Sequence, residues 1–238
     1  MNTKFLSALT ATAAATALFG AAAPAHAFSF GTNGIQFEND TQVIFNFRQT
    51  YGLFTSSLGV YQVSGPTPTL LKTLFSEVKP SDSAEDNYKG TLGNTVLGSG
   101  VETFTFLANQ IYTLGLKSVV GDSDRGTVYS TSALNVNSGG SQQALFFNPN
   151  GLLPQIVNAE DNASFAGNPA NFTSGDTLFT GGTGISFDDR GNANDADFQD
   201  FTVTASAVPE PMTMTGLALG LVGLVAARRR RRGSNTGS

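Results

Sequence analysis

The hexapeptide Phe201-Thr202-Val203-Thr204-Ala205-Ser206 alternates apolar with hydroxyl-bearing side chains. Successive side chains of a β-strand point to opposite sides of the sheet, so a period of two is typical of a strand with one buried and one polar face. The same alternation recurs in Tyr112-Thr113-Leu114-Gly115-Leu116-Lys117. Neither stretch repeats its apolar residues at the helical spacing of about 3.6 residues. Both therefore predict antiparallel strands.

Further short segments rich in Val, Phe, Leu and Tyr extend this pattern along the chain. The expected strands lie at 43–47, 58–63, 70–78, 104–106, 128–130, 143–147 and 184–187. Turn-forming clusters such as Asn137-Ser138-Gly139-Gly140 and Asn148-Pro149-Asn150-Gly151 separate them. Residues 28–207 are thus predicted to form a single antiparallel β-sandwich, jelly-roll-like, with phenylalanines filling the space between its sheets. Segments 79–100 and 148–174 are expected to be long loops.

Composition excludes several kinds of chemistry. The chain has no Cys, which excludes disulfides, and its one His is His26. Once residues 1–27 are removed, the protein has neither His nor Cys. Ser-His-Asp catalysis, Cys-His catalysis and an ordinary zinc site are then excluded. Residues 28–207 carry 17 Asp and Glu against 7 Lys and Arg, a net charge near −10. Because phosphate contacts need a basic surface, nucleic acid is not expected as a partner. Cations or basic surfaces suit this charge better.

The first 27 residues read as a secretory signal peptide. Lys4 provides the positive start, and an Ala- and Leu-rich stretch, 5–23, follows it and is expected to be helical in a membrane. Ala25-His26-Ala27 is a small-x-small cleavage site, after which Phe28 becomes the N-terminus. The alternative is an uncleaved anchor helix, which the alanine-rich composition and the cleavage triplet disfavour.

The other end of the chain has three parts in a fixed order. Val208-Pro209-Glu210-Pro211 precedes an apolar run, 212–227, which would span about 24 Å as a helix and so nearly cross a bilayer core of about 30 Å. The run ends in five arginines: Arg228, Arg229, Arg230, Arg231 and Arg232. Because clustered arginines stay on the cytoplasmic side, residues 28–207 are expected outside the membrane. Residues 233–238 are expected to be a disordered tail.

This end, Val208 to Arg232, resembles the PEP-CTERM sorting signal of bacterial surface proteins. In that family the tail is recognised by exosortase, a membrane cysteine protease thought to cut near the Pro-Glu-Pro and to release or transfer the protein. The resemblance implies export, a membrane-anchored intermediate and a final place at the cell surface or in the extracellular matrix, commonly beside exopolysaccharide. Pro209 and Pro211 would keep the recognition peptide extended and accessible. The alternative is a plain membrane anchor, and whether the tail is cleaved or retained stays open.

An acidic segment precedes the last expected strand. Five aspartates fall between positions 188 and 200, with Arg190 as the only basic residue among them. Calcium takes six to eight oxygen ligands from Asp, Asn and backbone carbonyls. The candidate ligands are Asp188, Asp189, Asn192, Asn194, Asp195, Asp197 and Asp200. No Glu closes the pattern, so it is not an EF-hand. A calcium site and a solvated acidic hairpin are both open interpretations.

The acidic region begins with Ile185-Ser186-Phe187-Asp188-Asp189, and after its loop comes Asp197-Phe198-Gln199-Asp200-Phe201-Thr202-Val203-Thr204. Together these segments are similar to the ending of a domain of unknown function in bacterial surface proteins. Asp188 stands where that family usually has Glu, and Gln199 where it usually has Asn. The resemblance implies a secreted β-domain and no enzymatic activity.

Three functions remain to be compared. The first is an exported, non-catalytic surface or matrix protein, processed by signal peptidase and exosortase and stabilised by Ca²⁺ if the acidic segment binds it. The second is a carbohydrate-binding module for an extracellular polysaccharide, which would need exposed aromatic residues although the chain has no Trp. The third is a glycosidase, which would need two carboxyl groups about 5 to 10 Å apart across a cleft. The sequence favours the first.

Overall fold

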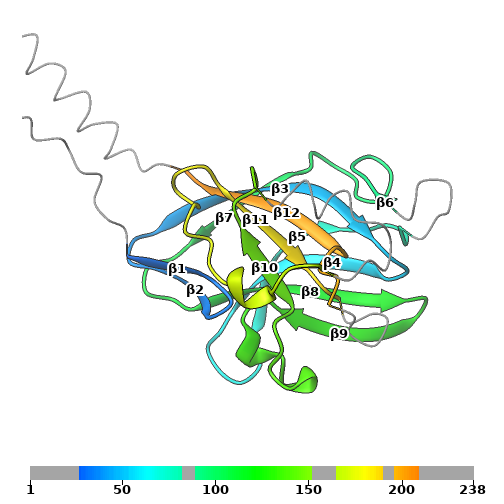
Figure 1. Ribbon diagram of the computed structural model, residues 1–238, viewed down its shortest axis with the longest axis horizontal. Coiled ribbons are helices and arrows are strands. Elements are labelled where there is room, and N and C mark those ends of the chain that lie inside the picture. The colour runs from blue at the N-terminus through cyan, green and yellow to red at the C-terminus, as the bar shows by residue number, and fades with distance from the viewer. Residues whose placement is uncertain (1–26, 82–88, 152–164, 190–195, 209–238) are drawn as a thin grey trace, which may run out of the picture. The chain divides into compact units, whose positions relative to one another are not determined.

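The computed structural model describes residues 27–81, 89–151, 165–189 and 196–208, which form two antiparallel β-sheets packed face to face (Figure 1). The first sheet has the order β1-β2-β8-β4-β5, and β9 also pairs with β8. Its strands are β1 (Phe28–Gly31), β2 (Gly34–Phe37), β4 (Thr55–Gln62), β5 (Thr69–Ser76), β8 (Tyr112–Val120) and β9 (Ser123–Tyr129). The prediction of an antiparallel all-β protein is confirmed.

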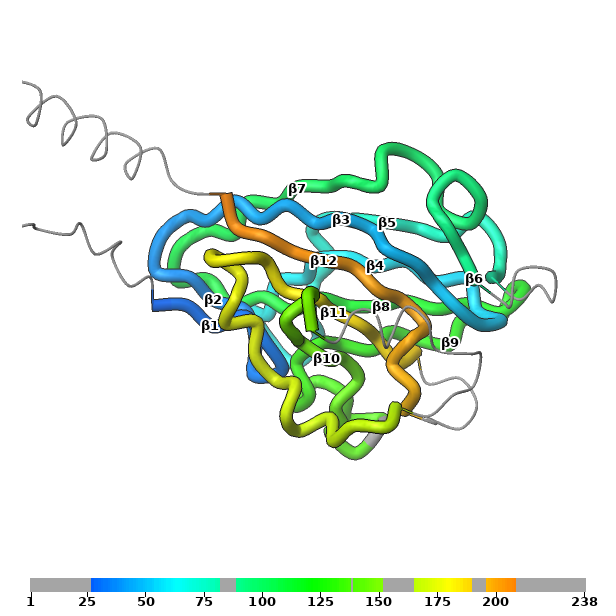
Figure 2. The backbone as a smooth tube through the Cα atoms, turned by 45° about the horizontal axis from the view of Figure 1, so that its top comes forward, coloured from blue at the N-terminus to red at the C-terminus, as the bar shows by residue number. Residues whose placement is uncertain are grey.

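The second sheet has the order β10-β11-β12-β3-β6, and β7 also pairs with β3. Its strands are β3 (Thr41–Tyr51), β6 (Lys89–Gly90), β7 (Val101–Phe106), β10 (Ala144–Phe147), β11 (Thr183–Phe187) and β12 (Phe201–Ala207). Short 3-10 turns lie at η2 (Ser132–Leu134), η3 (Val136–Ser138) and η4 (Pro169–Asn171). Figure 2 shows β3 and β12 side by side along the length of this sheet, as their register of paired residues requires.

Phenylalanines fill the space between the sheets, as the sequence predicts. Phe30 and Phe37 come from the first sheet, Phe45 and Phe187 from the second, and each is at most 2% exposed. Several rings meet edge to face, such as Phe30 against Phe146 at 5.7 Å. Each buried phenylalanine removes a large apolar surface from water, which stabilises the sandwich without disulfides.

The strand predictions match the structure in position and differ mainly in length. The hairpin β1–β2, joined by Thr32-Asn33, is missing from the sequence-based list, because its strands have only four residues each. The turn between β8 and β9 is short, because β9 begins at Ser123, which pairs with Val120. Lys117 and Asp124 form an ion pair of 3.2 Å across this hairpin.

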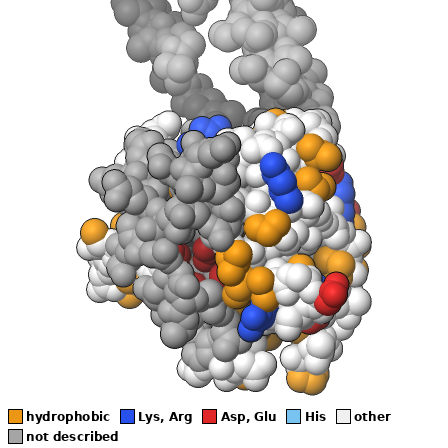
Figure 3. Space-filling model, turned by 90° about the vertical axis from the view of Figure 1, so that its right-hand side faces the viewer, with side chains coloured by type: hydrophobic (Ala, Val, Ile, Leu, Met, Phe, Trp, Pro, Cys, Tyr) orange, Lys and Arg blue, Asp and Glu red, His pale blue; other side chains and the backbone are white. Residues whose placement is uncertain are grey.

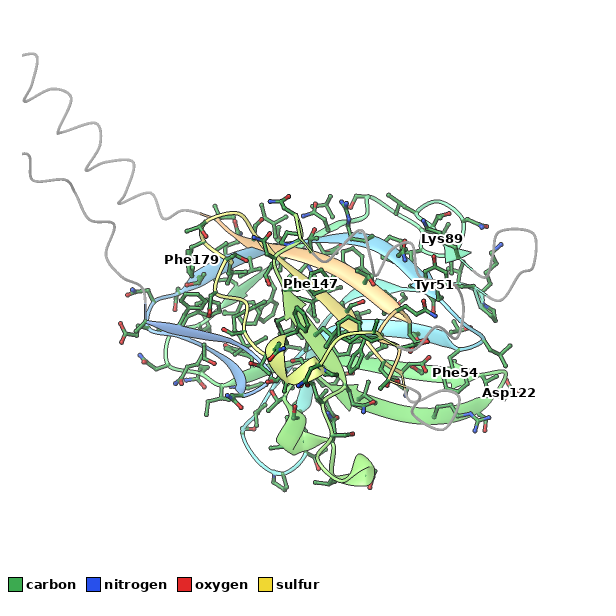
Figure 4. All side chains as sticks on the ribbon, in the orientation of Figure 1. Tyr51, Phe54, Lys89, Asp122, Phe147 and Phe179 are labelled. Atoms are coloured by element: carbon green, nitrogen blue, oxygen red, sulfur yellow. The ribbon has the colours of Figure 1, made fainter. Side chains whose placement is uncertain are left out.

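The start of β1 and the end of β12 lie at the same end of the sandwich. The Phe28 ring packs against Phe179 at 4.9 Å, and the backbone N–H of Ala207 donates to the carbonyl of the neighbouring Leu178. Figure 4 places Phe179 at this end and Tyr51 near the other. Since β12 has seven residues, at about 3.3 Å each, roughly 20 Å separates the two ends.

Both terminal segments, predicted as a signal helix and a membrane helix, lie outside the described residues. Within the part of the chain that the structure describes, no helix has the length and apolar character of a membrane span.

Candidate metal centre

Two segments of the acidic region meet because β11 and β12 are antiparallel neighbours. Phe187, the last residue of β11, pairs with Phe201, the first residue of β12. Asp188 and Asp189 therefore leave β11 beside Asp200, which enters β12. The backbone N–H of Asp189 donates to the Oδ2 atom of Asp200 at 2.7 Å. Residues separated by eleven positions in the chain thus become neighbours.

Neighbouring strands hold both sides of this junction in place. The backbone N–H of Asp188 donates to the carbonyl of Gln143 at 3.1 Å, just before β10. The backbone N–H of Tyr51, at the end of β3, donates to the carbonyl of Asp200 at 3.1 Å. The aspartates are therefore fixed by the second sheet itself, at the end opposite Phe28 and Ala207. Viewed from that end, acidic side chains are visible beside the atoms drawn in grey (Figure 3).

Three carboxylates converge here. One oxygen atom from each of Asp188, Asp189 and Asp200 lies within 4.8 Å of the other two. Asp188 is 0% exposed and Asp189 is 6% exposed, which is unusual for charged side chains. We call these three residues the carboxylate cluster. Its donors are all hard oxygen atoms, which suit Ca²⁺ or Mg²⁺ better than zinc.

The environment of Asp200 disfavours a negative charge in the absence of a cation. Burial raises its pKa well above the ordinary value, and the charges of Asp189, Asp197 and Asp188 raise it further. The hydrogen bond from the Asp189 N–H opposes this shift without cancelling it. A divalent cation at the cluster would reverse the balance, because it favours the ionised form of every carboxylate around it.

Asp197 and Gln199 stand next to the cluster. Asp197 is 6% exposed, and its Oδ2 atom accepts a hydrogen bond of 3.0 Å from Nε2 of Gln199. Gln199 is 0% exposed, and its Oε1 atom is buried and accepts no hydrogen bond among the described residues. A buried oxygen without a donor costs free energy, and a cation or a bound water would satisfy it.

The backbone around Asp197 is strained. Ala196 and Phe198 have φ values of 58° and 57°, in the left-handed region that non-glycine residues rarely adopt. The Phe198 ring compensates by packing with Leu145 and Phe147 in a small apolar cluster separate from the main core. This packing holds the segment on the sheet and so orients the residues from Asp197 to Asp200.

A further buried carboxyl group, Glu77, is absent from the sequence-based candidates. It is 6% exposed and accepts hydrogen bonds from the Ser56 N–H at 2.6 Å and from the Ser81 hydroxyl at 2.9 Å. Burial raises its pKa to about 7 despite these bonds, and the charge of Asp189 contributes to the rise. A single Glu just after β5 gives no sequence signal, because only the packing of the two sheets brings it near Asp189.

The structure thus brings together Asp188, Asp189 and Asp200 of the predicted ligands and places Asp197 close enough to affect Asp200. Asn192, Asn194 and Asp195 lie outside the described residues, and their part in a site stays a prediction. Among the predicted processing residues, Ala27, Phe28 and Val208 are described, whereas Ala25, Pro209, Glu210, Pro211 and Arg228 to Arg232 are not.

No protein-family model, no characterised protein and no solved structure matches this chain.

Proposed function

We propose that this chain is an exported, non-catalytic surface or matrix protein whose jelly-roll-like domain is stabilised by a divalent cation, with Ca²⁺ the best candidate. The carboxylate cluster is the observation that carries the proposal. Three carboxylate oxygens lie within 4.8 Å of one another, on a backbone that neighbouring strands hold in place, and a cation between them would offset their mutual repulsion. The missing Cys and the single His, His26, support a non-catalytic role.

Processing at both ends is part of the same proposal. Signal peptidase would cut after Ala27, and exosortase would recognise Val208 to Pro211 together with the apolar run 212–227 and the terminal arginines. The order of strands supports these borders, because β1 begins at Phe28 and β12 ends at Ala207. The compact unit that contains all the strands runs from His26 to Pro211. Neither cut would remove a residue from a strand.

Calorimetry tests the cation. Full-length protein, stripped with EDTA and dialysed, is titrated with CaCl₂ and, separately, with MgCl₂. We expect binding with a stoichiometry near one, and stabilisation of about 2.7 kcal/mol when free Ca²⁺ is 100 times its Kd. Asp188→Asn should weaken binding about tenfold or more, whereas Asp122→Asn, on the exposed turn between β8 and β9, should bind as the wild type. Absence of heat together with an unchanged melting temperature would refute the cation site.

Intact-mass analysis of the exported protein tests the processing. We expect a chain that begins at Phe28 and ends near Pro209. A full-length mass in the cytosolic fraction would contradict export, and an intact tail in the membrane fraction would favour the plain anchor.

A further inference from the structure

A groove lies on the first sheet, beside the end of β9. The loop between β4 and β5, the end of β9 and the turns η2 and η3 enclose about 270 Å³ there. Its apolar surfaces come from Pro66, Pro68, Tyr129 and Val136. None of the described residues that line it is charged, although the body of the protein is strongly acidic.

The aromatic wall of this groove is fixed before any ligand arrives. The Tyr129 ring lies 5.5 Å from the Tyr61 ring, at an interplanar angle of 88°. Tyr61 can occupy its place because residue 115 is glycine: a Cβ atom there would lie 2.6 Å from the Tyr61 ring. Asn135 accepts a hydrogen bond from the Tyr129 N–H at 2.8 Å and donates to the Tyr129 carbonyl at 2.9 Å. Little ordering of this wall is left for binding, which favours affinity.

Neutral hydrogen-bonding groups complete the lining. Thr67 and Thr127 each bring a hydroxyl group, and Asn137 brings an amide. Thr127 also forms a hydrogen bond with the Tyr61 side chain, so this hydroxyl group contacts the Tyr61–Tyr129 pair. Val136 lies at the rim and is 74% exposed.

We propose that this groove binds a neutral sugar. A sugar ring has an apolar face of C–H groups, which would pack on Tyr129 and the prolines, and a rim of hydroxyl groups, which would pair with the threonines and the amide. A purely apolar ligand would make no use of these hydroxyl and amide groups. An anionic ligand would meet no cationic side chain among the lining residues that the structure describes, and the acidic body would repel it. The volume is slightly below the range of about 300–1,000 Å³ for drug-sized ligands, so it suits one or two sugar units.

Saturation-transfer NMR on the full-length protein tests this assignment. The probes are glucose, galactose, mannose and N-acetylglucosamine, each as the monosaccharide and the trisaccharide. We expect transfer to at least one of them, with the C–H protons of the sugar receiving most saturation. Absence of transfer to every probe at millimolar concentration would overturn the proposal.

A matched pair of variants locates the binding. Val136→Arg fills the rim of the groove from an exposed position, and Leu97→Arg makes the same change at a residue that is 59% exposed and outside the groove lining. We expect Val136→Arg to weaken binding about tenfold or more and Leu97→Arg to leave it unchanged. Equal affinities of the two variants would place the sugar elsewhere and overturn the assignment. Neither side chain belongs to the core, so both variants should fold.

Discussion

The backbone N–H of Asp189 donates a 2.7 Å hydrogen bond to the Oδ2 atom of Asp200, so one carboxylate of the cluster is fixed by the chain segment that carries the other two. This bond continues the antiparallel pairing of β11 and β12 beyond Phe187 and Phe201. It determines the spacing of the three aspartates before any ligand binds. Such pre-organisation lowers the cost of collecting ligands but leaves their charges in close contact.

Asp200→Asn should change stability in opposite directions with and without calcium. In EDTA the variant removes a carboxyl group whose ionisation is opposed by burial and by the neighbouring aspartates, so we expect a gain of about 1 kcal/mol, or about 2–4 °C in melting temperature. In saturating Ca²⁺ the variant should be less stable than the wild type, because it lacks a charged ligand. Paired thermal melts measure both effects. A variant that melts below the wild type in EDTA and Ca²⁺ alike would show that Asp200 has a purely structural role.

Glu77 should make the free energy of unfolding fall as the pH rises through neutrality. Its pKa in the folded protein is about 7, above the reference value of 4.5, so between these values the folded state holds a proton that the unfolded state has lost. The stabilisation is fully present below pH 4.5 and is lost as the pH rises through 7, with an upper limit of about 3 kcal/mol. Glu77→Gln should remove this slope in urea titrations from pH 5 to 8, carried out in EDTA. An unchanged slope would assign the pH dependence to other groups.

Gly115→Ala should destabilise the first sheet. The added Cβ would lie 2.6 Å from the Tyr61 ring and displace it, at a cost of about 1–3 kcal/mol. Gly65→Ala is the matched control, because no atom lies within 4 Å of the position of its added Cβ. Urea denaturation should therefore separate the two variants clearly. Equal stabilities would mean that Tyr61 moves without cost and that the aromatic wall is not rigid.

Ala196→Gly should stabilise the domain by about 0.5–1 kcal/mol. Ala196 adopts a φ of 58°, which costs an alanine about 1–2 kcal/mol and costs glycine almost nothing. The gain is reduced by the greater freedom of glycine in the unfolded chain. Ala133→Gly, in the turn η2, has no positive φ to relieve and should be neutral or destabilising. A loss of stability at position 196 would show that the contact of its methyl group with the Phe198 cluster outweighs the strain.

Local alternation was enough to predict most strands. Phe201 to Ser206 and Tyr112 to Lys117 form parts of β12 and β8, with Phe201 and Leu114 facing the core as their period of two requires. The hairpin β1–β2 escaped prediction because four residues give too short a pattern, and its stability comes from Phe30 and Phe37 packing on the second sheet. Segment 79–100, expected to be a loop, contains the short strand β6, and much of segment 148–174 lies outside the described residues. The contacts of these segments depend on distant residues, as where Ser174 lies beside Gly31.

The sequence by itself determined the alternation that makes the strands and the acidic character of the segment before β12, because each of these depends on residues adjacent in the chain. The signals at the two ends stay predictions from the sequence. Only the tertiary structure decided which acids meet. Pairing of β11 with β12 brings Asp188 and Asp189 to Asp200, and packing of the sheets brings Glu77 under the influence of Asp189. It also decided that Tyr61 and Tyr129 stand together across Gly115, because contacts between strands depend on register.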